Sequence, residues 1–258
     1  MSAAAREVAD VMSIIPPIST PATPGPAEVI YPCSDGRPVG ETPVHRDNLL
    51  LTIEVLQEWF ASEPDVYVSG NMFMFYVKGD KRKHVSPDVF VVRGVPKDKP
   101  RKHYLLWEEG RGPDLVIEIT SDSTRRDDTN KKLKLYRDVL KVSEYFLFDP
   151  YREYLEGQLK GHRLRDGEYE PVLPNSGRLP SEVLGLHLEA DGEDLRLYDP
   201  KTGRWLPTAR EQARAERKRA DAEQERADAE AKRAREQQLE VERLRREIEL
   251  LKHRRPDA

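Results

Sequence analysis

The chain of 258 residues has a single cysteine, Cys33, which excludes an intrachain disulfide and a metal cluster held by several thiolates. A reducing compartment fits this composition, and we expect a cytoplasmic protein. The sequence also lacks a long apolar run and a basic N-terminal region followed by an apolar one, so we expect neither a membrane span nor a secretory signal. It has no glycine-rich phosphate loop, which argues against ATP dependence.

The chain has little net charge, because 43 basic side chains nearly balance 47 acidic ones. Binding to nucleic acid would therefore depend on local basic patches rather than on a global attraction. Two clusters could form such patches, at residues 78–84 and 125–134, although each cluster alone fits a solvated turn or helix face equally well. Aromatic side chains are sparse, which gives no support to a dedicated single-strand binder.

Composition divides the chain into three segments. Residues 1–27 are rich in proline and small side chains and predict a flexible leader. Residues 28–206 have the mixed character of one globular domain with a core of ordinary size. Residues 207–258 are dominated by Ala, Glu, Arg and Lys, which predicts one long charged helix.

Helices and strands alternate through the first half of the central segment. Thr42 and Pro43 resemble an N-cap and a first-turn proline, and Leu49, Leu56 and Phe60 follow at helical spacing. Short apolar runs then predict four strands, the first two joined as a hairpin around residues 69–71. These runs cover residues 65–68, 72–77, 85–92 and 115–120, and the last of them is apolar enough to be buried on both faces.

The second half of the segment predicts a parallel crossover. A helix is expected over residues 122–140, with Leu133, Tyr136 and Leu140 facing inward, and a fifth strand over residues 144–148. A strand, helix and strand in this order favour a right-handed parallel unit. Residues 153–200 alternate between short strands and turns, which we interpret as antiparallel hairpins that extend the same sheet. The predicted fold class is mixed α/β.

One carboxylate stands out because it lies inside an apolar strand. Glu118 is flanked by Ile117 and Ile119, and burying it costs several kcal/mol unless a metal ion, a cation or hydrogen-bond donors compensate. A second acid, Asp88, opens another apolar run, and Lys132 follows on the next helix. Two strand carboxylates beside a cationic group indicate a divalent-metal site suited to phosphodiester hydrolysis.

Four segments resemble, in order and spacing, the Uma-two family of restriction-endonuclease-like proteins. They are Pro87-Asp88-Val89-Phe90-Val91-Val92, Pro113-Asp114-Leu115-Val116-Ile117-Glu118-Ile119-Thr120-Ser121, Asp128 with Lys132 and Tyr136, and Glu144-Tyr145-Phe146-Leu147-Phe148-Asp149-Pro150. The resemblance covers roughly residues 40 to 190. It implies a PD-(D/E)XK nuclease core, with a central mixed sheet flanked by helices, and metal-dependent cleavage of DNA.

The resemblance also implies roles for individual residues. Asp88 and Glu118 match the acids of the first and second motifs and would bind Mg²⁺, or Mn²⁺ as a substitute, with the carbonyl oxygen of Ile119 as a further ligand. Thr120 occupies the position where the wider superfamily usually has a lysine. Lys132 matches the lysine that the Uma-two family supplies from the next helix, where it could orient water or neutralise charge on the phosphate.

Some assignments stay open at the level of sequence. Lys131 is a less favoured alternative to Lys132, and Asp128 lies one turn before Lys132, where an ordinary intrahelical ion pair is also expected. A first-helix acid could complete the site, and the candidates are Glu41, Glu54 and Glu58. His45 is more simply a packing or hydrogen-bonding residue. Tyr136 and Tyr145 are expected in the core with hydrogen-bonded hydroxyl groups.

The C-terminal segment carries a seven-residue repeat over residues 208–253. One position of the repeat holds Ala213, Ala220, Ala227, Ala234, Val241 and Ile248, and the position three residues further on holds Glu216, Glu223, Glu230, Gln237, Leu244 and Leu251. Only the last two heptads are apolar at both positions. They favour weak association, as a homodimer or with another coiled coil; a parallel pair, an antiparallel pair and a solitary helix all remain open.

Three functions are consistent with these observations. The first is a Mg²⁺-dependent DNA endonuclease that uses Asp88, Glu118 and Lys132. The second is a catalytically inert nuclease-like protein that dimerises or binds a partner through the C-terminal helix. The third keeps the same residues and acts on a nucleotide or another phosphoester.

Overall fold

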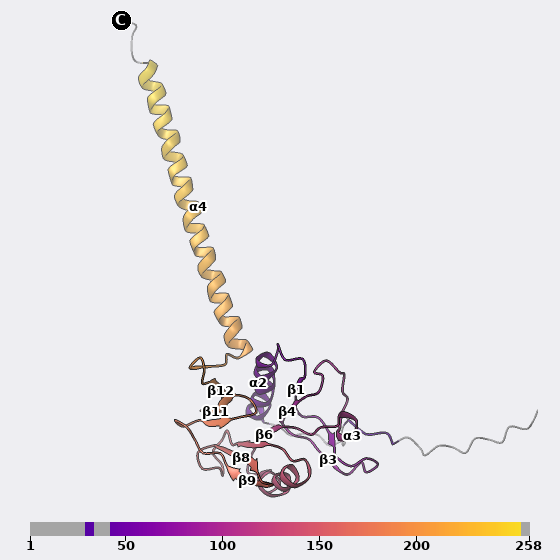
Figure 1. Cartoon of the computed structure of the whole chain (residues 1–258). Coiled ribbons are helices and arrows are strands. Elements are labelled where there is room, and N and C mark those ends of the chain that lie inside the picture. Colours follow the sequence, from indigo (N-terminus) through magenta and orange to yellow (C-terminus); the bar gives the residue numbers. More distant parts are fainter. Residues whose placement is uncertain (1–28, 34–41, 254–258) are drawn as a thin grey trace, which may run out of the picture. The chain divides into compact units, whose positions relative to one another are not determined.

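Figure 1 shows the computed structural model of the chain, which describes residues 29–33 and 42–253, with side chains described up to residue 250. The expected leader at residues 1–27 lies outside the described residues, as does Glu41. The chain divides into two units, Met1–Tyr31 and Pro32–Ala258. All of the elements below belong to the second unit.

The first described helix, α2 (Pro43–Trp59), begins where the sequence predicts it. The Thr42 side chain accepts a hydrogen bond from the backbone N–H of His45 at 3.2 Å, and Pro43 occupies the first turn, where its missing N–H costs nothing. Leu49 and Leu56 are buried, and they pack with other apolar side chains against the strands of the main sheet. This apolar face holds α2 against the sheet.

The main sheet has six strands in the order β1-β4-β6-β7-β8-β9. β6 and β7 are parallel, as the predicted crossover requires, and every other neighbouring pair is antiparallel. All residues of β6 and β7 are buried, which confirms the expectation for the strand that carries Glu118. The bounds are β1 (Val66–Ser69), β4 (Val89–Arg93), β6 (Leu115–Ile119), β7 (Glu144–Phe148), β8 (Leu159–Arg165) and β9 (Glu168–Pro171).

The helical connection between β6 and β7 is wound more widely than the predicted α-helix. It contains two π-helical stretches, η1 (Asp127–Lys132) and η2 (Leu135–Val139). π-helical turns are rare in proteins, and many of those known lie at functional sites. Tyr136 and Leu140 are buried on its inner side, as predicted, and Leu133 is partly buried there.

The expected hairpin around residues 69–71 is wrong. β1 pairs with β4, whereas β2 (Met74–Phe75) lies in a separate three-stranded sheet between β3 (His84–Val85) and β5 (Tyr104–Leu105). The strand expected over residues 85–92 is accordingly divided between β3 and β4. Pro87 lies at the break, where its missing N–H cannot join a ladder. A short helix, α3 (Leu106–Glu109), follows β5.

The last hairpins do not all extend the main sheet, which corrects a second expectation. Only β8 and β9 do so, and the rest form a four-stranded antiparallel sheet: β10 (Leu179–Ser181), β11 (Leu186–Asp191), β12 (Asp194–Asp199) and β13 (Arg204–Trp205). Alternate leucines of β11 and β12, such as Leu188 and Leu197, are buried in the same core cluster as Ile117 and Phe146. These strands therefore contribute apolar side chains to the core that covers the main sheet.

Alternation along β6 explains where Glu118 points. Ile117 and Ile119 belong to the apolar cluster that includes α2, whereas Val116 belongs to the opposite cluster, with Tyr136 and Leu140. Successive strand residues face opposite sides of a sheet, so Glu118 shares the side of Val116 and faces the helical connection.

The long helix α4 (Ala209–His253) forms where composition predicts it, and Figure 1 shows it as unbroken. Its start is a capping box, in which Glu211 N–H donates to the Thr208 hydroxyl at 3.2 Å and Thr208 N–H donates to the Glu211 carboxylate at 2.8 Å. Arg196 of β12 also donates to that carboxylate, at 2.9 Å. Within the described part of the chain, no helix combines the length and apolarity that a membrane crossing needs.

Candidate active site

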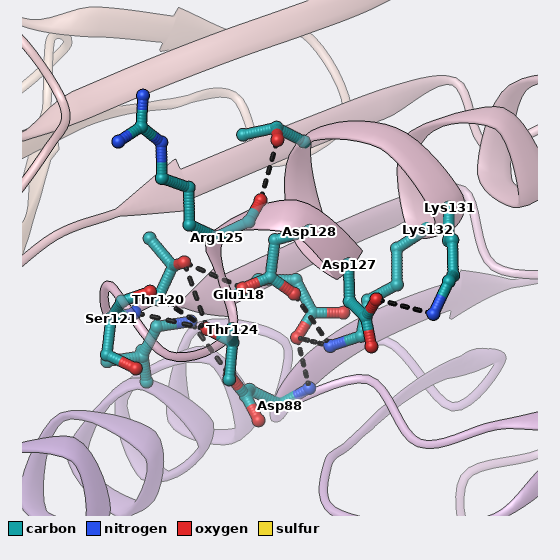
Figure 2. Close-up of polar contacts among 12 residues, drawn as sticks. Asp88, Glu118, Thr120, Ser121, Thr124, Arg125, Asp127, Asp128, Lys131 and Lys132 are labelled. Atoms are coloured by element: carbon teal, nitrogen blue, oxygen red, sulfur yellow. Dashed lines mark hydrogen bonds and ion pairs between the residues drawn. The ribbon is translucent and has the colours of Figure 1, made fainter.

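The two predicted acids are held together by reciprocal backbone contacts. The register of β4 on β6 sets Val89 opposite Ile117, so Asp88 lies next to the end of β6. The backbone N–H of Ile119 donates to Asp88 Oδ2 at 2.8 Å, and the backbone N–H of Asp88 lies 3.4 Å from Glu118 Oε2. Asp88 is thus held by the backbone of β6, and Glu118 by the backbone of Asp88, just before β4 (Figure 2).

Lys132 completes the predicted group. Its ammonium nitrogen donates to Glu118 Oε2 at 2.9 Å, and the hydroxyl of Tyr136 donates to Glu118 Oε1 at 2.6 Å. Both oxygens of a carboxylate whose side chain is only 1% exposed are therefore hydrogen-bonded. The structure brings Asp88, Glu118 and Lys132 together. The hydroxyl group of Tyr136 is hydrogen-bonded, as expected, and its partner is Glu118.

Asp128 is a third carboxylate at this site. Its Oδ1 lies 3.0 Å from the Lys132 ammonium, close enough for an ion pair although the geometry is not that of a hydrogen bond. The Asp128 side chain is only 2% exposed, whereas Lys132 is 25% exposed. The ammonium thus bridges two buried carboxylates, and Figure 2 shows it reaching between them.

A layer of hydroxyl groups holds Asp128 from behind. Thr120 donates to Asp128 Oδ2 at 2.7 Å and shares a further hydrogen bond with the hydroxyl of Tyr154. The hydroxyl of Tyr145 donates to the backbone carbonyl of Asp128 at 3.0 Å. Thr120, two residues after Glu118, therefore fixes the acid that pairs with Lys132.

The two acids Asp88 and Glu118 have pKa values shifted in opposite directions. Burial raises the pKa of Glu118 to about 8; Lys132 opposes this rise, and the negative charges of Asp88 and Asp128 add to it. Burial also acts to raise the pKa of Asp88, but the hydrogen bond from His45 and the charge of Lys132 outweigh it, so this pKa is lowered. The pKa of Lys132 is raised, because three carboxylates outweigh its burial.

The remaining candidates separate clearly. His45, at the start of α2, has its Nε2 3.5 Å from Asp88 Oδ1 and so belongs to the site. Lys131 instead pairs with Asp127 at 2.7 Å on the exposed face of the helix (Figure 2). Glu54 and Glu58 are exposed on α2. Thr120 and Tyr154 were not expected as site residues, and only the unusual threonine after Ile119 could have drawn attention to the first.

The oxygen atoms present suit a hard divalent cation that keeps part of its water shell. Among the described residues, no three His, Cys, Asp or Glu side chains are grouped so that they could hold a metal ion by themselves. Mg²⁺ is commonly bound by only one or two carboxylates, together with waters and substrate phosphates. Asp88 and Glu118 supply two carboxylates, and a cation would relieve the repulsion that helps to raise the pKa of Glu118.

Gly70 determines the position of Asp88 and gives a first testable prediction. A Cβ atom at Gly70 would lie 1.9 Å from the backbone oxygen of Asp88, a clash that requires backbone movement. Asn71 N–H also donates to the carbonyl oxygen of Pro87 at 2.9 Å, so the two loops are joined. We expect Gly70→Ala to displace Asp88 and to lower the free energy of unfolding by about 1–3 kcal/mol.

Urea denaturation measures the cost, and Gly79→Ala is a control of equal size. Gly79 has open space around its Cβ position, although its φ of +89° adds some backbone strain. Equal destabilisation by the two substitutions would contradict the role of the close contact at Gly70.

Comparison with known proteins identifies the family. A family model for Uma2, described as "Putative restriction endonuclease", matches residues 25–193, and the chain belongs to this nuclease family. The resemblance expected from the four segments is thereby confirmed. A crystal structure described as a putative nuclease belonging to DUF820, from Anabaena variabilis, shares 17% identity over 58% of this chain and 79% of that chain, with a TM-score of 0.43. No curated protein is significantly similar.

Proposed function

We propose that the protein is a metal-dependent DNA endonuclease whose site is formed by Asp88, Glu118 and Lys132. One observation carries the proposal: the carboxylate of Asp88, just before β4, and that of Glu118, on the adjacent strand β6, are held together by backbone contacts, and the Lys132 ammonium lies 2.9 Å from Glu118. Membership of a family described as restriction endonucleases supports nucleic acid as the substrate.

Asp88 and Glu118 would hold the cation, with the carbonyl oxygen of Ile119 as the further ligand. Asp88 is the more accessible of the two acids, with 17% of its side chain exposed, and its low pKa keeps it ionised near neutral pH. A bound divalent ion would supply a polarised phosphate oxygen and an activated water. Mg²⁺ is the ion we expect, with Mn²⁺ as a substitute.

Lys132 contributes a fixed positive charge beside these acids. Its raised pKa keeps it protonated, so it can neutralise charge on the phosphate or orient water, but it is not a general base in this state. Tyr136 donates a hydrogen bond to the other carboxylate oxygen of Glu118, and Asp128 forms an ion pair with Lys132. The positions of Glu118 and Lys132 are thus set by hydrogen bonds and an ion pair within the protein.

Exposed basic side chains on the neighbouring segments support a DNA substrate. Lys78, Lys81 and Lys83 precede Asp88, and Arg126 and Lys134 lie on the helical connection that carries Lys132. Contacts between such side chains and phosphates supply affinity that does not depend on DNA sequence and that falls steeply with salt.

Cleavage of supercoiled plasmid DNA tests the proposal. Purified protein is incubated with Mg²⁺, Mn²⁺ or EDTA, beside Asp88→Asn at equal concentration. We expect nicked or linear DNA with either metal, none with EDTA, and at least about a hundredfold less with the variant. Equal metal-dependent cleavage by the variant would overturn the site, and inactive folded protein on plasmid and single-stranded DNA would overturn the activity.

Metal binding should also stabilise the fold. A cation that binds the folded state at about ten times its Kd contributes about 1.4 kcal/mol, which raises the melting temperature by roughly 3–6 °C for a domain of this size. We expect this rise with millimolar Mg²⁺ or Mn²⁺, measured by differential scanning fluorimetry, and its loss in Asp88→Asn. The same rise in both proteins would place the ion elsewhere.

A further inference from the structure

Val241, Leu244 and Ile248 near the end of α4 form an apolar stripe that no other part of the described chain buries. Val241 is 48% exposed, Leu244 48% and Ile248 52%. Every side chain from residue 212 to residue 250 is exposed, so this stripe gains nothing from the remainder of the described chain. The spacing of three and four residues puts the three side chains on one face of the helix.

The residue types on this stripe favour a coiled coil of two parallel helices. Val241 and Ile248 are β-branched and occupy the first core position of the heptad, a, while Leu244 occupies the second, d. β-branched residues at a with leucine at d favour parallel dimers over higher oligomers. Upstream, alanine at a and glutamate at d would bury little area and place like charges in the seam. Pairing is therefore confined to the end of the helix.

Charges beside the seam distinguish the two orientations. Glu240 precedes Val241 at position g, and Arg245 follows Leu244 at position e. In a parallel pair, each g residue faces the e residue five positions later on the other helix, so Glu240 meets Arg245. The sequence repeats this relation at residues 247 and 252. In an antiparallel pair g faces g and e faces e, which would bring like charges together.

The intrahelical contact of Glu240 does not prevent it from pairing with Arg245 of a second helix. Glu240 Oε2 lies 3.7 Å from the guanidinium of Arg243, and both side chains are more than half exposed. Such an exposed pair contributes little, so it does not compete strongly with a contact to a second helix.

We propose that the end of α4, residues 237–253, forms a parallel two-stranded coiled coil with a second copy of this chain. The occupant is a second copy because the g and e charges complement each other within this one sequence. In a parallel pair the two preceding domains lie at the same end of the coiled coil. The inference is independent of the proposed nuclease activity.

Sedimentation equilibrium of the full chain tests the association. We expect a mass near that of a dimer at high protein concentration, falling toward that of a monomer on dilution. Leu244→Glu should raise the dimer Kd at least tenfold, whereas Leu239→Glu, at position f outside the seam and 60% exposed, should change it less than threefold. A monomer at every concentration, or equal effects of the two substitutions, would overturn the proposal.

Charge reversal tests the orientation. Glu240→Lys puts a lysine opposite Arg245 of the second copy in a parallel pair and should weaken the dimer, whereas residues 240 and 245 do not face each other in an antiparallel pair. The double variant Glu240→Arg, Arg245→Glu should restore the parallel dimer. Separately, Gln237→Cys in a Cys33→Ser background should form a disulfide-linked dimer under mild oxidation. Failure of the double variant to restore the dimer, or no disulfide at residue 237, would refute the parallel arrangement.

Discussion

Replacing Glu118 with glutamine is expected to reduce metal-dependent DNA cleavage by about 10³-fold, equivalent to roughly 4 kcal/mol of transition-state stabilisation. The substitution keeps the shape of the side chain and an oxygen to accept from Tyr136, which donates to it at 2.6 Å. It removes the negative charge that would bind the cation. The loss should therefore appear in the cleavage rate while the protein remains folded.

Circular dichroism and the melting temperature establish that Glu118→Gln is folded. Glu54→Gln is the matched control, because Glu54 is an exposed glutamate on α2 and lies on no predicted metal-binding strand. The control should cleave at the parent rate. Full activity in Glu118→Gln would remove this residue from the catalytic site and leave its burial unexplained.

Replacing Lys132 with methionine is expected to affect both activity and stability. Loss of the positive charge should lower the cleavage rate by about 10²–10³-fold. It should also lower the free energy of unfolding near neutral pH by about 3–5 kcal/mol, because Glu118 and Asp128 lose their shared cation while nearly fully buried. Urea denaturation and plasmid cleavage measure the two effects on the same preparations.

The stability loss in Lys132→Met should depend on pH. Burial already raises the pKa of Glu118 to about 8 with the lysine present, and removing the lysine raises it further. A carboxyl group whose folded-state pKa is raised favours folding below its unfolded pKa, near 4.3, and loses that contribution as pH increases. Between pH 4.5 and 8 Glu118 stays protonated in both folded proteins, so its contribution falls equally in the two. The difference from the parent should therefore be constant over that range and grow only above about pH 8, where Glu118 ionises in the parent and not in the variant.

Lys131→Met is the control for both effects. Lys131 is the adjacent lysine, its side chain is 80% exposed, and it pairs only with an exposed aspartate in the described contacts. Such a surface change should cost less than about 0.5 kcal/mol at any pH and leave cleavage unchanged. If the two lysine variants behaved alike, the bridge from Lys132 to the buried acids would have no energetic importance.

The grouping of Glu118 with Lys132 could be predicted from sequence because Glu118 violates the apolar pattern of its strand. Glu118 lies between two isoleucines, and that local conflict requires a partner wherever the strand is placed. Side chains alternate between the two faces of a sheet, so Glu118 points away from its isoleucine neighbours and toward the helix that carries Lys132. The role of Thr120 and Tyr154 in holding Asp128 could not be predicted, because it depends on a contact between residues 34 positions apart in the chain.

Strand partners were harder to predict than strands. Residues 69–71 have the composition of a hairpin turn, yet Gly70 is there because the chain passes close to the backbone of Asp88. Glycine serves both purposes, and sequence alone does not separate them. The leucines of β11 and β12 likewise show that one face is buried without showing which layer covers it. Pairing and layering are set by tertiary contacts.

An anomalous difference map from crystals grown with Mn²⁺ tests the central claim most directly, because it locates the ion without reference to activity. We expect a peak bound by the carboxylates of both Asp88 and Glu118, beside Lys132, and no such peak in crystals of Asp88→Asn. A peak bound only by other residues, in protein that cleaves DNA with Mn²⁺, would show that Asp88 and Glu118 do not form the metal site.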